Sequence, residues 1–287
     1  MVKIDKSKII KVMIVVVIIV IFVLVLFLGM KLNSVAEETK RMPEHQTRCG
    51  GPTHILRHVV TLGDMDPRIS LHLADRFPYT VAVTRNSSGI WAFACFASVI
   101  LVKWIVTAAH CRMPGHTHRA ILYYDFAHNQ THSFPILFWR MHEKYNRTLL
   151  SPKYDIAVAK LNVQNYKHTL RASVFDESIA KEIEASVWKT ISTMDKKLYL
   201  TNQFTKYDLR ISQPGRCFES FGVEIDESMI CVDATDFSDC FHHDFGPIYS
   251  GDKVVGVLLI KPVDCDMKLS IFTNISYYTT WIMKTTV

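Results

Sequence analysis

Several widespread sequence signatures are missing from this chain of 287 residues. There is no internal repeat, no low-complexity segment and no basic run interleaved with aromatic residues, so the net charge of +6 gives no indication of a nucleic-acid partner. The HExxH and CxxC patterns that accompany many zinc sites are also absent. We therefore expect no cofactor, no bound metal and no nucleic acid.

Charge is missing from one long segment. The 19 residues from Val12 to Met30 are uncharged, which is long enough to cross a bilayer as a single helix. Four lysines precede this segment and three basic residues follow it, a bias that favours a short cytoplasmic tail at residues 1–11 and an extracellular C-terminal domain. The alternative is a signal peptide cleaved after Ala36, which would give a secreted protein.

The remainder divides into a stem and a β-rich domain. Residues 31–68 are polar, broken by proline and glycine, and lack a sustained apolar period. Residues 69–287 contain many short apolar runs separated by turns, which predicts an all-β sandwich or barrel. The closing segment SYYTTWIMKTTV is expected to form a short helix, with Tyr278, Trp281 and Ile282 at helical spacing. The expected strands are YTVAVT, IWAFACF, SVILVKWIV, AILYYDF, DIAVAKL, LYLTNQF, KVVGVLLI and LSIFTNI. YSGDKVVGVLLI is expected to form a hairpin, with Gly251 and Asp252 supplying the turn.

Cysteines and Asn-x-Ser/Thr tripeptides indicate the compartment. Seven cysteines occur together with four possible glycosylation acceptors, a combination that suits an oxidising, glycosylating environment. A single tripeptide arises readily by chance, so only the set carries weight. The four acceptors are Asn86, Asn129, Asn146 and Asn274.

Two motifs point to a particular chemistry. WIVTAAHC places His110 beside a cysteine at the end of an apolar strand, and YDIAVAKL sets Asp155 at the head of another. The chain resembles the trypsin/chymotrypsin-like serine proteases over residues 69–287. The resemblance rests on these motifs and on PYTVAV, CFASVILVKWIVTAAHC, SMICVD and FTNISYYTTWI, which follow one another in the order that the family has. The resemblance implies two packed six-stranded antiparallel β-barrels with a C-terminal helix, here preceded by one N-terminal transmembrane helix. It also implies that His110 is the base and Asp155 its orienting partner.

The resemblance also implies the disulfide pairing. Six cysteines alone allow fifteen connectivities. The family's pattern pairs Cys95 with Cys111, Cys217 with Cys231, and Cys240 with Cys265. Cys49 is left over in the stem, where a disulfide-linked dimer, a bond to another protein and a free thiol all remain open.

The segment DCFHHDFGP departs from the family at the residues that matter for catalysis. The family writes this loop as Cys-x-Gly-Asp-Ser-Gly-Gly-Pro, and this chain runs from Cys240 to Pro247. The nucleophilic serine is replaced by Asp244, the oxyanion-hole glycine by His242, and the aspartate that receives the new amino terminus by His243. A zinc site built from His110, His242 or His243 with Asp244 is an alternative by residue type, but adjacent histidines point in different directions and no zinc-binding pattern supports it.

Substrate recognition and activation also depart from the family's pattern. Ser238 takes the pocket-floor position where trypsin-like members carry aspartate, and Lys261 and Ser270 stand where small wall residues are usual. The nearest match to the activation start is Arg68 followed by ISLH, without the usual glycines.

Together these departures predict a catalytically inactive serine protease homologue. We expect it to act by binding proteins, as a cofactor, decoy or adaptor for proteases or their regulators, outside the membrane. The alternative is a serine-type endopeptidase with residual or relocated chemistry, for which Ser238 and Ser250 are the nearest candidates. A sequence error or unusual allele at this loop is the third possibility.

Overall fold

The computed structural model describes residues 59–60, 67–127, 133–147, 152–163, 173–174, 182–192, 198–234, 246–261 and 268–287. The predicted transmembrane segment at 12–30 and Cys49 lie outside these ranges. Within them, no helix is both long enough and apolar enough to span a membrane.

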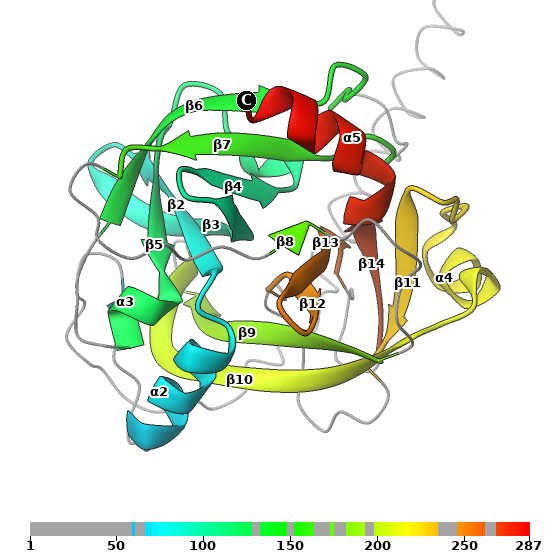
Figure 1. Ribbon diagram of the computed structural model, residues 1–287, viewed down its shortest axis with the longest axis horizontal. Coiled ribbons are helices and arrows are strands. Elements are labelled where there is room, and N and C mark those ends of the chain that lie inside the picture. Colours follow the sequence, from blue (N-terminus) through cyan, green and yellow to red (C-terminus); the bar gives the residue numbers. More distant parts are fainter. Residues whose placement is uncertain are drawn as a thin grey trace, which may run out of the picture. The chain divides into compact units, whose positions relative to one another are not determined.

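The first half of the described chain forms a closed six-stranded barrel (Figure 1). Its strands are β2 (Thr80–Ser87), β3 (Ile90–Leu101), β4 (Trp104–Thr107), β5 (Thr117–Leu122), β6 (Ser133–Met141) and β7 (Ala157–Leu161). Around the barrel they follow the order β2-β3-β4-β7-β6-β5, and β5 pairs with β2 to close it. The interior is filled by apolar residues that recur at alternate positions, among them Val81, Val83, Ile105 and Val158, all fully buried.

The second half forms another ring of six antiparallel strands. They are β9 (Glu182–Ser192), β10 (Leu198–Ile211), β11 (Met229–Asp233), β12 (Ile248–Ser250), β13 (Lys253–Ile260) and β14 (Leu269–Asn274). The order is β10-β11-β14-β13-β12-β9, and pairing of β9 with β10 closes the ring. Two short strands join in parallel, β1 (Val59–Val60) on β10 and β8 (Ser173–Val174) on β13. The fold predicted for the domain, two six-stranded antiparallel barrels, is therefore confirmed.

The hairpins follow from local turn chemistry. Between β2 and β3, Ser88 and Gly89 both have positive φ, and the Asn86 Oδ1 accepts a hydrogen bond from the Gly89 amide at 2.9 Å. Such two-residue turns match the twist of antiparallel strands. The predicted β12–β13 hairpin also forms, with Gly251 at φ +62° and Ser250 paired with Lys253.

The helices are short and lie at the edges of the barrels. They are α2 (Pro67–Arg76), the 3-10 turn η1 (Ala109–Cys111), α3 (Tyr123–Ala127), α4 (Pro214–Phe221) and α5 (Ile275–Thr285). The predicted C-terminal helix is confirmed as α5, whose Tyr278 and Ile282 are buried while Trp281 remains partly exposed. The Asn274 side chain caps it by accepting the Ser276 amide at 3.1 Å.

Two expected strands are partly wrong. The run SVILVKWIV is divided by a turn, since β3 ends at Leu101 and β4 begins at Trp104. The run AILYYDF continues β5 only to Leu122, and Tyr123 begins helix α3. Tyr123 is fully buried and stacks on Phe204 at 3.7 Å between ring centroids, with Trp188 at 5.2 Å. Packing between the barrels therefore decides the conformation of a segment whose β-propensity alone favours a strand.

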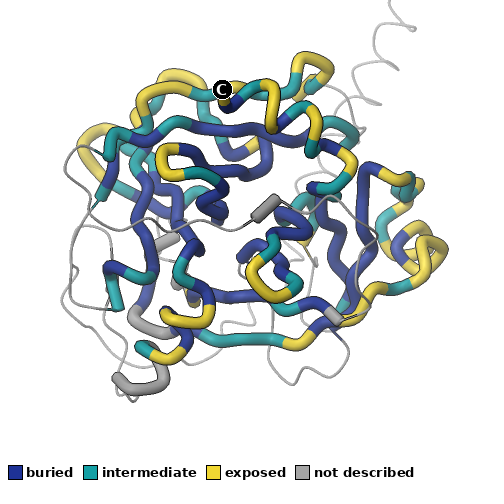
Figure 2. Tube along the Cα trace, viewed as in Figure 1, coloured by how far each residue is buried: buried dark blue, intermediate teal, exposed yellow. Residues whose placement is uncertain are grey.

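The two barrels share a buried seam. Phe77 packs against Phe204 and Tyr249, with ring centroids 6.5 and 5.7 Å away. Thr80 Oγ1 lies 2.8 Å from Ser186 Oγ and 3.3 Å from the Tyr249 hydroxyl, so these three hydroxyls form a hydrogen-bonded group at the seam. Figure 2 shows buried strands surrounded by exposed turns in both barrels. This seam fixes how the segments carrying the candidate site face each other.

Candidate functional site

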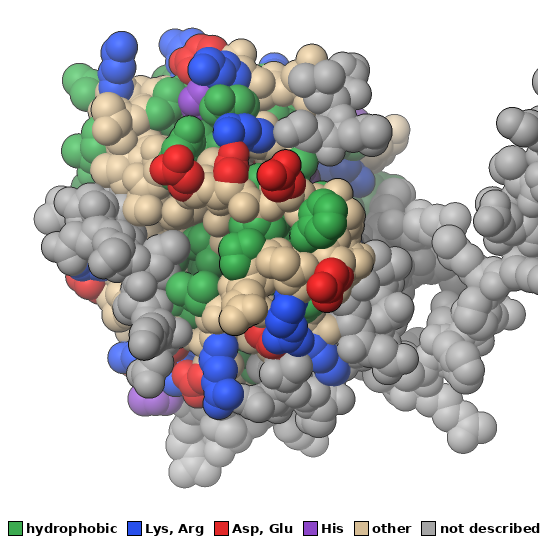
Figure 3. Space-filling model, turned by 90° about the vertical axis from the view of Figure 1, so that its right-hand side faces the viewer, with side chains coloured by type: hydrophobic (Ala, Val, Ile, Leu, Met, Phe, Trp, Pro, Cys, Tyr) green, Lys and Arg blue, Asp and Glu red, His purple; other side chains and the backbone are tan. Residues whose placement is uncertain are grey.

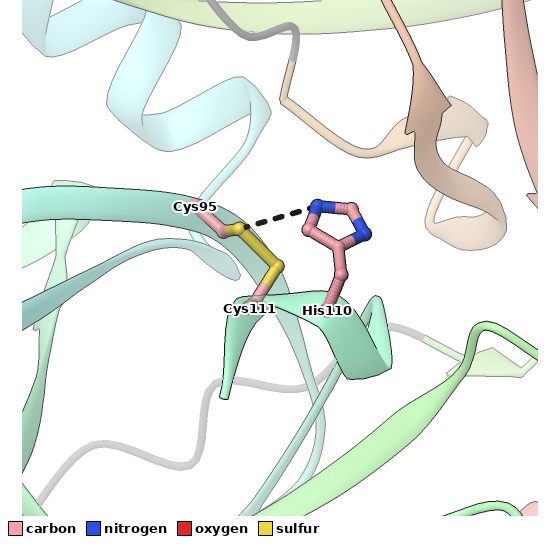
Figure 4. Close-up of side chains that lie close together, drawn as sticks. All are labelled: Cys95, His110 and Cys111. Atoms are coloured by element: carbon pink, nitrogen blue, oxygen red, sulfur yellow. Dashed lines mark hydrogen bonds between the residues drawn. A yellow bond between two sulfur atoms is a disulfide. The ribbon is translucent and has the colours of Figure 1, made fainter. Parts of the chain in front are cut away.

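His110 lies on a rigid turn at the end of β4. The strand runs into η1, and the disulfide between Cys95 and Cys111 ties this turn to β3 (Figure 4). Cys111 is buried, whereas the His110 side chain is 42% exposed. The turn therefore holds its backbone fixed while it presents the imidazole to solvent.

Asp155 makes two hydrogen bonds to His110. Its Oδ2 lies 2.7 Å from His110 Nδ1, and its Oδ1 accepts the His110 backbone amide at 2.8 Å. Because a carboxylate only accepts, Nδ1 carries the proton and Nε2 is the basic nitrogen of the neutral ring. The structure therefore brings together the base and orienting partner predicted from sequence. Nε2 lies 3.7 Å from Cys95 Sγ.

The backbone around Asp155 is held by the second barrel. Thr273 Oγ1, on β14, donates to the Asp155 carbonyl at 3.1 Å, and the Tyr278 hydroxyl accepts the Tyr154 amide at 3.1 Å. Tyr154 adopts φ +65°, an unusual value for a non-glycine residue, while its ring stacks on His142 at 4.8 Å. Contacts from β14 and α5 thus support a strained turn that aims the Asp155 carboxylate at His110.

Arg147 also supports this turn, and sequence reasoning missed it. Its guanidinium donates to the backbone carbonyls of His110 at 2.9 Å and Arg112 at 2.6 Å. These contacts span 37 and 35 positions. No local pattern around Arg147 signals them.

The cluster of Cys95, His110 and Cys111 has the residue types of a metal site. Their potential ligand atoms all lie within 4.8 Å of one another. Both cysteines, however, are joined in a disulfide, and thiolates are the form that binds metal. Of the three side chains in this cluster, only the His110 imidazole could therefore act as a metal ligand.

The second-barrel half of the predicted site is only partly described. The disulfide between Cys217 and Cys231 is present, as the resemblance implied. The positions Cys240, Cys265, Ser238, His242, His243 and Asp244 lie outside the described residues. Their assignment continues to rest on the sequence.

Gly246, directly after that loop, has a steric role. It is buried, and a Cβ built on it would lie 1.9 Å from the Ser186 carbonyl oxygen of β9. No side chain fits such a gap without backbone movement. Gly246 therefore lets the chain lie close to β9 at this point.

The two described substrate-pocket positions differ in environment. Lys261 is exposed at the end of β13, whereas Ser270 on β14 is 2% exposed. The Ser270 Oγ has no hydrogen-bond partner among the described residues. The structure therefore buries a hydroxyl at one predicted wall position and leaves the other at the surface.

The nearest match to an activation start lies within a helix. Arg68 and Ile69 fall in the first turn of α2. At the other end of this helix, Arg76 donates to both carboxylate oxygens of Glu184, at 3.0 and 2.8 Å, and Phe77 is fully buried. Freeing residues 69–76 as an extended amino terminus would require unwinding this helix.

The possible glycosylation acceptors differ in exposure and in the hydrogen bonds that their side chains make. Asn146 is exposed, whereas the Asn274 Nδ2 already donates to the Glu227 carbonyl at 2.8 Å. Asn86 uses its Oδ1 in the β2–β3 turn. Asn129 lies outside the described residues.

Comparisons with known proteins agree with this geometry. The family model Trypsin matches residues 72–282. Trypsin epsilon of Drosophila erecta is 25% identical over 224 residues, covering 74% of this chain and 83% of that protein. Trypsin delta of Drosophila melanogaster is 28% identical over 211 residues, covering 69% and 79%.

Solved structures share the fold. Neuropsin, a serine protease expressed in the limbic system of mouse brain, superimposes with a TM-score of 0.57 at 18% identity, covering 74% of this chain and 95% of that one. The structure of GrC gives the same TM-score at 20% identity, covering 73% and 94%. A family match across most of the described barrels, the paired His110 and Asp155, and this shared fold lead to one conclusion: the chain belongs to the trypsin family of serine proteases.

Proposed function

We propose that this chain is a catalytically inactive member of the trypsin family that acts by binding proteins. The observation that carries the proposal is the presence of Asp244 at the position of the nucleophilic serine, in a loop that also has His242 and His243. The family mechanism needs a hydroxyl that loses its proton to the histidine and attacks an acyl carbon. A carboxylate is already ionised at neutral pH, and its attack would give a mixed anhydride.

The substitutions beside Asp244 oppose catalysis independently. The tetrahedral oxyanion needs hydrogen-bond donors, and losing one donor typically costs about 3 kcal/mol. Asp244 places negative charge near that oxyanion, and His242 replaces a glycine at a donor position. Removing the nucleophile alone lowers turnover about a million-fold in subtilisin. These changes act on the same step, so their effects need not add.

The retained pair of His110 and Asp155 is compatible with an inactive protein. Asp155 Oδ1 accepts the His110 backbone amide at 2.8 Å, and the Asp155 carbonyl accepts from Thr273. The aspartate therefore supports the η1 turn and its link to the second barrel. Such structural roles give a reason to retain Asp155 without catalysis.

The environment of α2 is a further support. In this family, activation creates a new amino terminus that pairs with an aspartate, and His243 stands at that position. Residues 67–76 are helical here, and Arg76 and Phe77 anchor the helix end to β9 and to the seam. A cut after Arg68 would thus leave the new amino terminus within a helical segment, and the residue expected to receive it is a histidine and not an aspartate.

We further propose that the domain lies outside the membrane. The uncharged segment from Val12 to Met30 would hold it there, with residues 1–11 in the cytoplasm. Binding partners would be proteases, their inhibitors or recognition proteins, and Cys49 would be available for an intermolecular disulfide. N-terminal sequencing of the protein from a eukaryotic membrane fraction tests the anchor. A mature chain beginning at Glu37 and found only in the medium would contradict it.

Fluorophosphonate labelling tests catalytic inactivity. The glycosylated protein is treated with the probe before and after limited trypsin digestion, and we expect no adduct in either case. Asp244→Ser alone is also expected to remain unlabelled. The matched control is His242→Gly/His243→Asp/Asp244→Ser, which restores the family's residues at all three positions.

Labelling of the unmodified protein, mapped to a residue beside His110, would reject the proposal. It would favour the second candidate, an endopeptidase with relocated chemistry. That candidate draws support from the intact pair of His110 and Asp155 and from the named trypsins among its relatives.

A further inference from the structure

A cavity of about 660 Å³ opens on the first barrel, where β5 and β6 separate. The two strands pair at only three positions, Arg119 with Pro135, Ala120 with Phe134 and Ile121 with Ser133. Beyond Pro135, β6 pairs with β7, and its register shifts between Ile136 and Phe138. The cavity is lined by residues of both strands and by residues 112–116, which follow η1. Its size falls within the range of about 300–1,000 Å³ seen for ligand sites.

The cavity wall is positively charged. Its lining residues include Arg112, Arg119, His116 and His118 but no aspartate or glutamate. The Arg119 guanidinium donates to Ser133 Oγ at 3.0 Å and lies 5.4 Å above the Trp91 ring, while that of Arg112 contacts Met141 Sδ at 3.9 Å. Neither guanidinium has a carboxylate partner within the described part of the chain.

Electrostatics at His118 agree with this charge distribution. Burial, together with the positive charges of His116, Arg85 and Arg112, lowers the pKa of His118 to about 4. By contrast, acidic and basic side chains lie interspersed on the face that carries α4 and α5 (Figure 3). Uncompensated arginines in a concave, partly apolar wall attract carboxylates more strongly than mixed charges on an open surface do.

Apolar side chains of β6 also line the cavity. Leu137 is 56% exposed and Phe138 39% exposed, although both lie in the middle of β6. Trp139 also lines the cavity and contacts the His118 ring edge-on at 5.2 Å. A ligand that carries only negative charge would leave these apolar side chains unused. A ligand with carboxylates and apolar side chains would use both the arginines and the apolar side chains.

We propose that this cavity binds an acidic, extended peptide segment of a partner protein. Its carboxylates would pair with Arg112 and Arg119, whose planar guanidinium groups suit bidentate binding, and an apolar side chain would pack on Leu137 and Phe138. A sulfated polysaccharide would share the charge but not the apolar contact. The inference goes beyond the proposed lack of catalysis and holds whether or not His110 supports a reaction.

Fluorescence anisotropy with three labelled peptides tests the proposal. The first contains glutamate alternating with phenylalanine and isoleucine, the second has lysine in place of glutamate, and the third contains glutamate only. With the full-length protein in detergent, we expect the first to bind at least tenfold more tightly than either of the others. Its affinity should fall with added salt, because arginine–carboxylate attraction is screened.

Variants assign the binding to the cavity. Arg112→Gln and Arg119→Gln should each lower affinity for the first peptide about tenfold, and Leu137→Ser should lower it without changing binding of the glutamate-only peptide. Lys189→Ala, an exposed cation on β9 outside the cavity, is the matched control and should bind as the unmodified protein does. Thermal unfolding of each variant separates loss of binding from loss of fold.

Two outcomes would overturn the proposal. One is unchanged peptide affinity in a folded Arg112→Gln/Arg119→Gln double variant. The other is a heparin fragment that displaces the peptide and itself binds more tightly, with an affinity unaffected by Leu137→Ser. Neither result bears on fluorophosphonate labelling, so failure here and failure of the inactive-enzyme proposal can be told apart.

Discussion

The two barrels retain different parts of the family's design. In the first, the residues of the chemistry also build the fold: His110 adjoins the disulfide-bonded Cys111, and Asp155 hydrogen-bonds the backbone of the same turn. In the second, Gly246 has a packing role alone: a Cβ there would lie 1.9 Å from the Ser186 carbonyl oxygen of β9. The first barrel therefore combines candidate chemistry and structural support in the same two side chains, whereas Gly246 contributes by having no side chain.

Removing the disulfides gives the largest expected effect on stability. The two described bridges close loops of similar length, with sequence separations of 16 and 14. Loop-closure entropy therefore predicts a loss of about 3 kcal/mol for each double alanine variant, Cys95→Ala/Cys111→Ala and Cys217→Ala/Cys231→Ala. Urea unfolding measures both. A loss confined to one barrel would show that the bridges are not equivalent in the two halves.

Gly246→Ala tests the packing role assigned to the second barrel. Overpacking usually costs about 1–3 kcal/mol, and we expect the upper end because the new Cβ would meet a backbone carbonyl at 1.9 Å. Gly215→Ala is the matched control: nothing lies within 4 Å of its Cβ, and it sits in α4, where alanine is favoured by up to about 1 kcal/mol. Equal stability of the two variants would refute the steric argument.

Asp155→Ala tests the structural role assigned to the first barrel. It removes both hydrogen bonds and leaves the His110 amide without its acceptor, so we expect a loss of about 2 kcal/mol. His110→Ala keeps the bond from Asp155 Oδ1 to the backbone and removes a 42% exposed ring, so about 1 kcal/mol is expected. Chemical denaturation ranks the two. A larger loss for His110→Ala would remove the structural reason for retaining Asp155.

Acid should destabilise the first barrel through His118. Burial, aided by the positive charges of His116 and Arg85, lowers its folded-state pKa to about 4, and its Nε2 accepts the Met113 amide at 3.3 Å. The unfolded chain, with a pKa near 6.5, therefore binds the proton more readily between pH 6.5 and pH 4, and stability falls as pH falls through this window.

The expected loss from His118 is about 1–2 kcal/mol between pH 7 and pH 5. Urea unfolding of His118→Gln and of the unmodified protein at both pH values measures how much of the acid destabilisation comes from His118. Burial also lowers the pKa of His142, so part of the acid sensitivity should remain in the variant. An identical pH dependence for both proteins would show that His118 is not a source of it.

Most of the fold was predictable from local patterns. Short apolar runs predicted most of the strands, although not β6 or β9. Gly251 and Asp252 predicted a hairpin, and the spacing of Tyr278 and Ile282 predicted α5. These features follow from side-chain periodicity and turn conformations of a few residues. The ordered motifs also placed His110 and Asp155 in one site, 45 positions apart in the chain.

Other features depended on contacts that no local pattern encodes. Tyr123 turns into α3 because it stacks on Phe204, and Arg147 holds the His110 turn across 37 positions. The cavity between β5 and β6 arises from the point at which two strands cease to pair.

The sequence by itself determined the family, the succession of strands and the presence of an aspartate at position 244, because each is written in the identity and order of residues along the chain. Only the tertiary structure decided that Asp155 supports the turn it is expected to serve, that Gly246 meets Ser186, and that two arginines share an acid-free wall. These depend on distances between segments far apart in sequence, which the closing of the barrels and their buried seam set.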